Sequence, residues 1–438
     1  MELLLHYIWK HKILPLGGLV TTEGEEVEVL SPGLHNHDAG PDFSGAKVRI
    51  GNTVWAGDVE IHVRTSDWFR HHHETDPAYG NIILHVASVI DCELSYPTSE
   101  RVPQVRLEVP EYVRKNYDTL IKAEVFPKCA RILGNFSRIN MRGWLTALEI
   151  ERLEMRTGQI MERRELLDKN WEDTLFVTLA RCFGFGKNGD AFERWAYSIP
   201  MGAVAKHRDN LFQIEAIFFG QAGLLEENNG DEYYLKLRRE YAYLRQKFTL
   251  RPMESKIWKF LRLRPQNFPH VRIAQLAMLY YRQEIGLARV ISATENTEEA
   301  GKRLKELLAV PASEYWNEHY SFSKEAQRKT EKKLSAASVE LVAINGITPV
   351  LFAYGRYKDD EKLCKRAMDM LEAIPSENNR YIRAWKSAGM AVENAADSQA
   401  LMQLTKSYCV RNDCLRCRFG KEYIKCTPTW LNEDECDG

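Results

Sequence analysis

Apolar and polar residues alternate along several short segments of the first 110 residues, a pattern that predicts β-strands. Stretches rich in Gly, Pro and Asn separate these segments and are typical of turns. The expected strands cover residues 25–30, 46–50, 53–63, 81–90 and 102–109. Residues 2–9 predict a helix before the sheet. Residues 81–90 are apolar on both faces, which predicts a central strand with cover on each side.

From about Pro110 onward the apolar positions recur every three or four residues, as in amphipathic helices. The clearest of these segments are residues 141–166, 209–225, 231–248, 271–285 and 358–374. The glycine-rich residues 181–192 predict a turn between helices, because they lack the Gly-Lys-Ser/Thr ending of a phosphate loop. We therefore expect an α+β domain over residues 1–110, a large all-α domain over 111–400 and a cysteine-rich tail over 401–438.

The composition fits an ordinary globular protein and narrows the function classes only a little. The chain has 438 residues, of which 44% are hydrophobic and 28% charged, with a formal net charge of −1. This balance argues neither for nor against nucleic acid, because a local basic groove is compatible with a neutral total. The apolar runs are too short to span a bilayer, so no membrane partner is expected. Nine cysteines without an export signal predict reduced thiols or a metal site in a cytoplasmic protein.

The candidate chemistry begins in the strand predicted at residues 53–63. Asp58, Glu60 and His62 occupy alternate positions there and share one face. Asp42 follows a Gly-Pro turn that can deliver its carboxylate to the neighbouring strand. Carboxylates that converge from two strands suit a hard cation such as Mg²⁺ or Mn²⁺, so Asp42, Glu60 and Asp58 are candidate ligands. A solvated polar strand face is the alternative interpretation.

This pattern resembles the PD-(D/E)-x-K nuclease superfamily, in which Pro-Asp precedes an Asp/Glu-x-Lys strand. Here Pro41-Asp42 is followed by Glu60-Ile61-His62, in the order helix, strand, Pro-Asp strand, Glu-x-His strand. The resemblance implies a restriction-endonuclease-like mixed sheet. It also implies catalysis by Asp42, Glu60 and His62, with the Ile61 carbonyl at the metal. His62 replaces the family's lysine, and Glu2 is the acid available on the first helix.

A second resemblance extends over most of the chain. The segments "AGPDFSGAKVRI" and "GDVEIHVRTSDWFRHHHETDPAYGNIILHV", together with the late cysteines, resemble an uncharacterised bacterial family of unknown function. That resemblance implies no activity.

Histidines are dense around the proposed carboxylates. We interpret His73 and His85 as residues that orient the ligands, and His85 interrupts a strand that is otherwise apolar. A satisfied core histidine is the commoner interpretation of such a residue. Another chemistry is open, because His35 and His37 form a His-x-His pair before Asp42, which is compatible with Fe²⁺ or Zn²⁺ in a small-molecule metalloenzyme.

Cys409, Cys414, Cys417 and Cys426 lie close together near the end of the chain. Four thiolates at short spacing are typical of a structural zinc site or an iron–sulfur cluster. Cys436 is an alternative fourth ligand. The alternative to a metal site is that the four cysteines are unrelated reduced thiols.

A third candidate lies at residues 258–277, where Arg262, Arg264 and Arg272 alternate with aromatic residues. Such a mixture suits a nucleic-acid strand, although a helix end with paired arginines is the commoner explanation. Together these features predict a Mg²⁺-dependent nuclease that acts on nucleic acid. The alternatives are a non-catalytic binding module on a degenerate nuclease fold and a histidine-based metalloenzyme.

Overall fold

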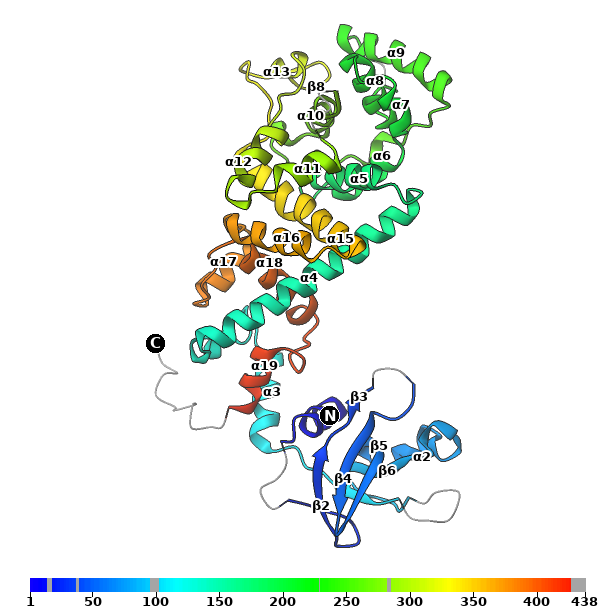
Figure 1. Cartoon of the computed structure of the whole chain (residues 1–438), viewed down its shortest axis with the longest axis vertical. Helices are drawn as coiled ribbons and strands as arrows, with labels where there is room; N and C mark the ends of the chain where they lie inside the picture. Colours follow the sequence, from blue (N-terminus) through cyan, green and yellow to red (C-terminus); the bar gives the residue numbers. More distant parts are fainter. Residues whose placement is uncertain (14–17, 37–38, 95–101, 228, 282–284, 427–438) are drawn as a thin grey trace. The chain divides into compact units, whose positions relative to one another are not determined.

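The computed structural model describes residues 1–13, 18–36, 39–94, 102–227, 229–281 and 285–426 (Figure 1). Contacts divide the chain into two compact units. Unit 1 joins Met1–Phe136 to Lys406–Gly438, and unit 2 is Ser137–Thr405. The sequence pattern suggested boundaries at residues 110 and 400. By contacts, residues 111–136 and the cysteine-rich segment belong with the sheet in unit 1.

Unit 1 contains a mixed sheet that follows helix α1 (Glu2–Lys10). The strands run in the order β1-β2-β4-β5-β6-β7, and β3 pairs with β4. Their bounds are Leu19–Val20 for β1, Glu26–Ser31 for β2, Leu34–His35 for β3, Phe43–Ile50 for β4, Thr53–Arg64 for β5, Ile82–Val89 for β6 and Gln104–Arg106 for β7. Strands β4 and β5 form an antiparallel hairpin, whereas β5, β6 and β7 are parallel.

The connection from β5 to β6 is a crossover, as parallel neighbours require. It consists of α2 (Asp67–Arg70) and two short 3₁₀ turns, η1 (His73–Thr75) and η2 (Pro77–Tyr79). Asp76 caps η2 by accepting a hydrogen bond from the Ala78 amide. This crossover returns the histidine-rich segment to the sheet beside β5.

Strand β5 is buried on both faces over residues 59–62, where successive side chains point to opposite faces, and α1 and α2 pack against this strand. Val59 and Ile61 are fully buried on one face. On the other face, Glu60 and His62 are only 4% and 2% exposed. The interpretation of these polar residues as a solvated strand face is therefore wrong for Glu60 and His62.

The rest of unit 1 is helical. It contains α3 (Glu111–Lys122), η3 (Ala130–Asn135) and α19 (Arg418–Lys425), and η7 (Leu404–Cys409) lies across its boundary with unit 2. Helix α3 packs against α19. The buried Asn116 side chain joins them by donating to the carbonyls of Ile424 and Cys426, at 3.2 and 2.8 Å. The C-terminal segment is thereby fixed to residues that follow the sheet.

Unit 2 is a large helical region, as the periodicity predicts. Its helices are α4 (Arg138–Leu166), α5 (Trp171–Phe183), α6 (Gly189–Tyr197), α7 (Met201–Ala205), α8 (Leu211–Gln221), α9 (Glu232–Phe248), α10 (Pro269–Tyr281), α11 (Leu287–Ala293), α12 (Thr297–Leu308), α13 (Tyr315–Glu318), α14 (Ala336–Val342), α15 (Thr348–Lys358), α16 (Glu361–Ala373), α17 (Arg380–Ser387) and α18 (Ala395–Gln403). Several begin at an Asn or Asp whose side chain accepts from the first turn, as Asn170 does for α5. A large apolar core includes the buried rings of Trp195, Phe218 and Trp316.

One continuous helical segment, Ala336–Lys358, is long and apolar enough to cross a membrane. However, 67% of its apolar window is buried inside the protein, as in a core helix of a globular unit. Its apolar character therefore follows from packing within unit 2. The cytoplasmic location that the cysteines suggest stays a prediction.

Candidate active site

The hairpin of β4 and β5 brings the carboxylates of Asp42 and Glu60 together. Asp42 directly precedes β4, and Phe43 pairs with Val59 next to Glu60. The Asp42 amide donates to Glu60 Oε2, and the Ile61 amide donates to Asp42 Oδ2, each at 3.0 Å. These reciprocal hydrogen bonds hold the two acids side by side.

The two carboxyl groups differ in their electrostatic state. Burial, and then the charge of Asp42, raises the pKa of Glu60 to about 9. Burial also raises the pKa of Asp42, but His6 and the Ile61 amide outweigh it and hold that pKa below its ordinary value. Two neighbouring carboxylates cannot both ionise cheaply in a buried place. The proton on Glu60 relieves this repulsion, and a divalent cation between the two groups would do the same.

His6 of α1 is a further member of the site. Its buried Nε2 lies 3.2 Å from Asp42 Oδ2. Our sequence analysis missed it and pointed to Glu2, which lies one turn earlier and acts electrostatically on both His6 and Glu60. The available signal was the spacing, because residues four apart on a helix share a face.

Glu60 also lies close to two imidazoles, and a third imidazole is near both of them. Glu60 Oε1 lies 3.5 Å from His62 Nε2 and 3.3 Å from His73 Nε2. The ligand atoms of His62, His71 and His73 all lie within 4.8 Å of one another. Within the described residues, no other three potential ligands of this kind are gathered so tightly. The geometry of this triad is compatible with a metal ion.

His62 carries no positive charge near neutral pH. Burial, and then the nearby His85, His73 and His71, lowers the pKa of His62 to about 3. It is therefore neutral near pH 7, the form in which imidazole binds metals. His85, fully buried in β6, places Nε2 2.9 Å from His62 Nδ1 and so orients the ring. His73 stacks on Tyr79, with 3.9 Å between ring centroids.

Asp58 lies apart from this acid pair. Its Oδ1 accepts a hydrogen bond from the Gly45 amide at 3.0 Å, and Asn81 Nδ2 lies 3.4 Å from its Oδ2. His35 stacks on Phe43 and lies edge-on to His6, whereas His37 lies outside the described residues.

The arginines proposed for nucleic acid have different surroundings. Arg272 is 4% exposed, donates to Gln275 and Asn267, and lies over the Phe185 ring. Its assignment to nucleic acid is wrong, because it is part of the packing of unit 2. Arg262 and Arg264 are exposed. The neighbouring Trp258 is buried in the apolar core, where no base can stack on it.

The four predicted cysteines do not form one group. Cys417 lies immediately before α19 and Cys426 immediately after it. At about 1.5 Å of rise per residue, the helix separates their Cα atoms by about 13 Å. They therefore cannot share one zinc ion, and Cys426 is not its fourth ligand. Cys436 lies outside the described residues.

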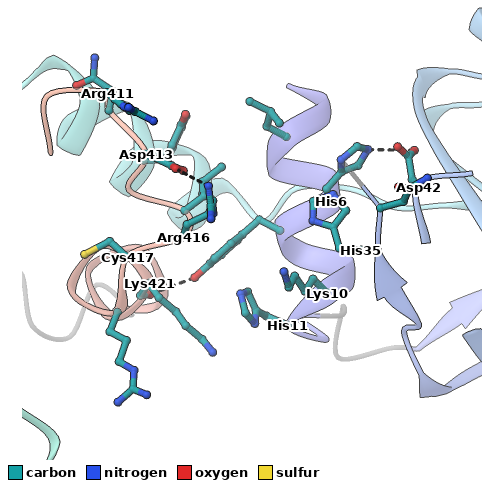
Figure 2. A pocket seen from close by; sticks show the side chains of 17 residues that line it. His6, Lys10, His11, His35, Asp42, Arg411, Asp413, Arg416, Cys417 and Lys421 are labelled. Atoms are coloured by element: carbon teal, nitrogen blue, oxygen red, sulfur yellow. Dashed lines mark hydrogen bonds and ion pairs between the residues drawn. The ribbon is translucent and has the colours of Figure 1, made fainter. Parts of the chain in front are cut away.

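A cavity of about 800 Å³ in unit 1 adjoins His6 and Asp42 (Figure 2). One wall is α1, and the other comes from residues 411–421. Tyr7 links the two walls by donating to the Lys421 carbonyl at 3.2 Å. The basic residues that line the cavity are Lys10, Arg411, Arg416, Arg418 and Lys421.

Positive charge prevails in this cavity. The acidic lining residues are Asp42 and Asp413, and Asp413 is paired with Arg416 at 3.3 Å. Burial, and then the charges of Lys421, Lys425 and Lys10, lowers the pKa of His11 to about 4. Burial and neighbouring cations also lower the pKa of Lys421. The cavity is therefore suited to an anion.

Comparison with known proteins places the chain in a family without assigning a reaction. The profile of DUF2851, described as a protein of unknown function, matches residues 2–380. The chain belongs to this family. Searches of curated proteins and of solved structures found no significant match. The acid pair, the imidazoles and the basic cavity of this DUF2851 protein all belong to unit 1.

Proposed function

We propose that this DUF2851 protein is a divalent-metal-dependent nuclease that hydrolyses phosphodiester bonds. The observation that carries the proposal is the buried pair of Asp42 and Glu60 beside a cationic cavity. The pair suits Mg²⁺ or Mn²⁺, and the cavity suits the phosphates of a nucleic acid. The two features adjoin at His6 and Asp42.

Asp42 and Glu60 would hold the cation, and His6 is within reach as a third ligand. Such a cation polarises a phosphoryl oxygen and lowers the pKa of a bound water. His62 stays neutral, so its role is to bind or orient and not to neutralise the developing charge. His85 fixes the orientation of the His62 ring through the contact between their nitrogens.

The wall formed by residues 411–421 would position the substrate. Arg411, Arg416 and Lys421 can neutralise backbone phosphates, a contact that fixes register without reading sequence. Binding should therefore weaken steeply with salt. The cavity that this wall lines also reaches Asp42, so a strand bound in it would lie beside the acid pair.

The order of elements supports a restriction-endonuclease-like fold. Helix α1 precedes β2, the Pro-Asp strand β4 and the Glu-x-His strand β5, and a helical crossover leads to the parallel β6. This order agrees with the resemblance to PD-(D/E)-x-K nucleases on the residues that carry the motif. We infer nuclease chemistry from that agreement together with the acid pair.

The test is a cleavage assay with the full chain on labelled single- and double-stranded DNA and RNA, in Mg²⁺ or Mn²⁺. Asp42→Asn and Glu60→Gln should each abolish cleavage, because each removes a candidate ligand charge. Asp58→Asn is the matched control. It removes a carboxylate from the same strand that lies outside the pair, and cleavage should persist. Failure to cleave any substrate, or equal cleavage by all variants, would refute the proposal.

A binding measurement with the same labelled nucleic acids distinguishes a non-catalytic binding module from an enzyme. Lys421→Glu should weaken nucleic-acid binding, whereas Lys47→Glu, an exposed lysine on β4, should not. Binding that follows this pattern without any cleavage would identify a non-catalytic module.

The triad of His62, His71 and His73 favours the second candidate, a histidine-based metalloenzyme for a small molecule. This candidate predicts one tightly held Zn²⁺ or Fe²⁺ that survives loss of the cysteines. His71→Ala should release that ion, whereas the exposed neighbour His72→Ala should retain it.

A further inference from the structure

Four thiols from separate parts of unit 1 lie around one place. Cys129 directly precedes η3, and Cys417 directly precedes α19. These two elements contact each other, and the rings of Phe136 and Phe419 meet edge-on with 4.9 Å between centroids. Lys128 Nζ donates to Asn412 Oδ1 at 2.9 Å. Cys129 is thereby brought to the loop between Cys409 and Cys414, although it is remote in sequence.

The electrostatics identify the same four residues. Burial raises the pKa of the Cys129 thiol, and the charges of Cys417, Cys409 and Cys414 raise it further. The pKa of Cys409 responds in the same way to burial, Cys417 and Cys414. Cys426 differs, because burial and Glu422 account for the rise in its pKa. This agrees with the contacts between η3 and α19 and between Lys128 and Asn412, which make Cys129 the thiol that joins Cys409, Cys414 and Cys417.

The backbone around Cys414 and Cys417 is shaped to accept an anionic sulfur. The Cys417 amide donates to the Cys414 carbonyl at 3.2 Å and closes a tight turn. A Cβ on Gly420 would lie 2.1 Å from that carbonyl oxygen, so glycine permits the chain to wrap the turn. Cys417 stands at the N-terminus of α19, where the amides of Gly420 and Phe419 hydrogen-bond to its sulfur and oppose the rise that burial causes in its pKa.

We propose that Cys129, Cys409, Cys414 and Cys417 together hold one thiolate-ligated metal centre, either a zinc ion or an iron–sulfur cluster. A metal that binds these four cysteines as thiolates would stabilise the folded chain, because its binding free energy adds to the free energy of folding. A four-cysteine site leaves no open coordination position, so its role is structural. It would fasten the segment that contributes Arg411, Arg416 and Lys421 to the cavity wall.

The spacing of the sulfurs bears on the identity of the metal. Zinc–sulfur bonds of about 2.3 Å in a tetrahedron place the ligand sulfurs about 3.8 Å apart. An iron–sulfur cluster spreads its cysteines over several irons, so its ligand sulfurs lie farther apart. Metal and sulfide analysis distinguishes the two kinds of centre.

The experiment is metal and acid-labile sulfide analysis, with an absorption spectrum, on the full chain purified without oxygen. We expect about one zinc ion or one cluster per chain, and visible absorption with sulfide indicates the cluster. Cys129→Ser should lose at least half of the metal. Cys426→Ser is the matched control and should retain it. Absence of zinc and iron from the wild type, or loss in Cys426→Ser with retention in Cys129→Ser, would overturn the assignment.

A second measurement avoids any failure of Cys129→Ser to fold. The wild-type chain is alkylated before and after treatment with a strong chelator, and the modified cysteines are mapped by mass spectrometry. Cys129, Cys409, Cys414 and Cys417 should become reactive together on chelation, whereas the reactivity of Cys426 should not change. Independent exposure of the four thiols would contradict a shared centre. Retention of the metal in Asp42→Asn separates this result from the proposed nuclease site.

Discussion

Glu149 of α4 should make unit 2 less stable as the pH rises. Its side chain is 4% exposed, and Oε1 has no hydrogen-bond partner in the described structure. Burial, and then the charge of Glu372, raises the pKa of Glu149 to about 7. The folded protein therefore keeps a proton that the unfolded chain releases above its ordinary pKa of about 4.5.

The sign and size of the effect follow from this difference. Stability from the protonated carboxyl is fully present below pH 4.5 and is lost by about pH 7, because unfolding releases the proton over that range. The interval corresponds to about 3 kcal/mol at 1.36 kcal/mol per pKa unit. Glu149→Gln cannot lose a proton, so its free energy of unfolding should exceed that of the wild type by about 2 to 3 kcal/mol more at pH 8 than at pH 5.

The assay is urea denaturation at pH 5 and pH 8, followed by helical circular dichroism and tryptophan fluorescence, with transitions fitted separately for a chain of two units. Glu162→Gln is the matched control, because Glu162 lies on the same helix and is exposed. Its stability should follow that of the wild type. If Glu149→Gln and Glu162→Gln showed the same pH dependence, a buried proton on Glu149 would be refuted.

Three further substitutions test other contacts. Gly220→Ala should destabilise unit 2 by about 1 to 3 kcal/mol, because a Cβ there would lie 2.1 Å from the Tyr241 ring. A thermal melt measures this loss. Gly202→Ala is the control and should lower the stability less, because the space around Gly202 is open. Asn116→Ala should leave the Ile424 and Cys426 carbonyls without their donor and speed amide hydrogen exchange in α19, while exchange in β5 stays unchanged. His6→Gln should weaken Mn²⁺ binding about 10- to 100-fold by calorimetry, and an unchanged affinity would exclude His6 as a ligand.

The local pattern of apolar and polar residues was sufficient to predict most of the helices and strands and the pairing of Asp42 with Glu60. The period of two predicted β5, the short apolar run of residues 81–90 predicted β6, and the period of 3.6 predicted α4, α9 and α16, because each pattern is set by which faces an element buries. Asp42 and Glu60 were accessible to the same reasoning, because a short hairpin joins their strands. The burial of Glu60 and His62 could not be predicted in this way, because it depends on the helices that pack against β5.

The residues that sequence reasoning missed depend on contacts between remote segments. His6 is paired with Asp42 only because α1 packs on the sheet. Cys129 joins the C-terminal thiols only because η3 packs on α19. Arg272 was wrongly predicted to bind nucleic acid, because its side chain is in fact buried over the Phe185 ring. Spacing along the chain carries no information on such contacts.

The arrangement around Glu60 is better explained by binding than by stability. Glu60, His62 and His85 are all buried, and each must be held in its uncharged form at some energetic cost. His85 Nδ1 also has no hydrogen-bond partner within the described structure. Apolar residues would pack there at lower cost, whereas a cation turns the same donor atoms into ligands. A cation that binds the folded chain alone must then stabilise it, by about 2.7 kcal/mol at 100 times its dissociation constant. Glu60→Gln should remove that gain while the metal-free fold becomes more stable, a combination that a purely structural role for Glu60 does not produce.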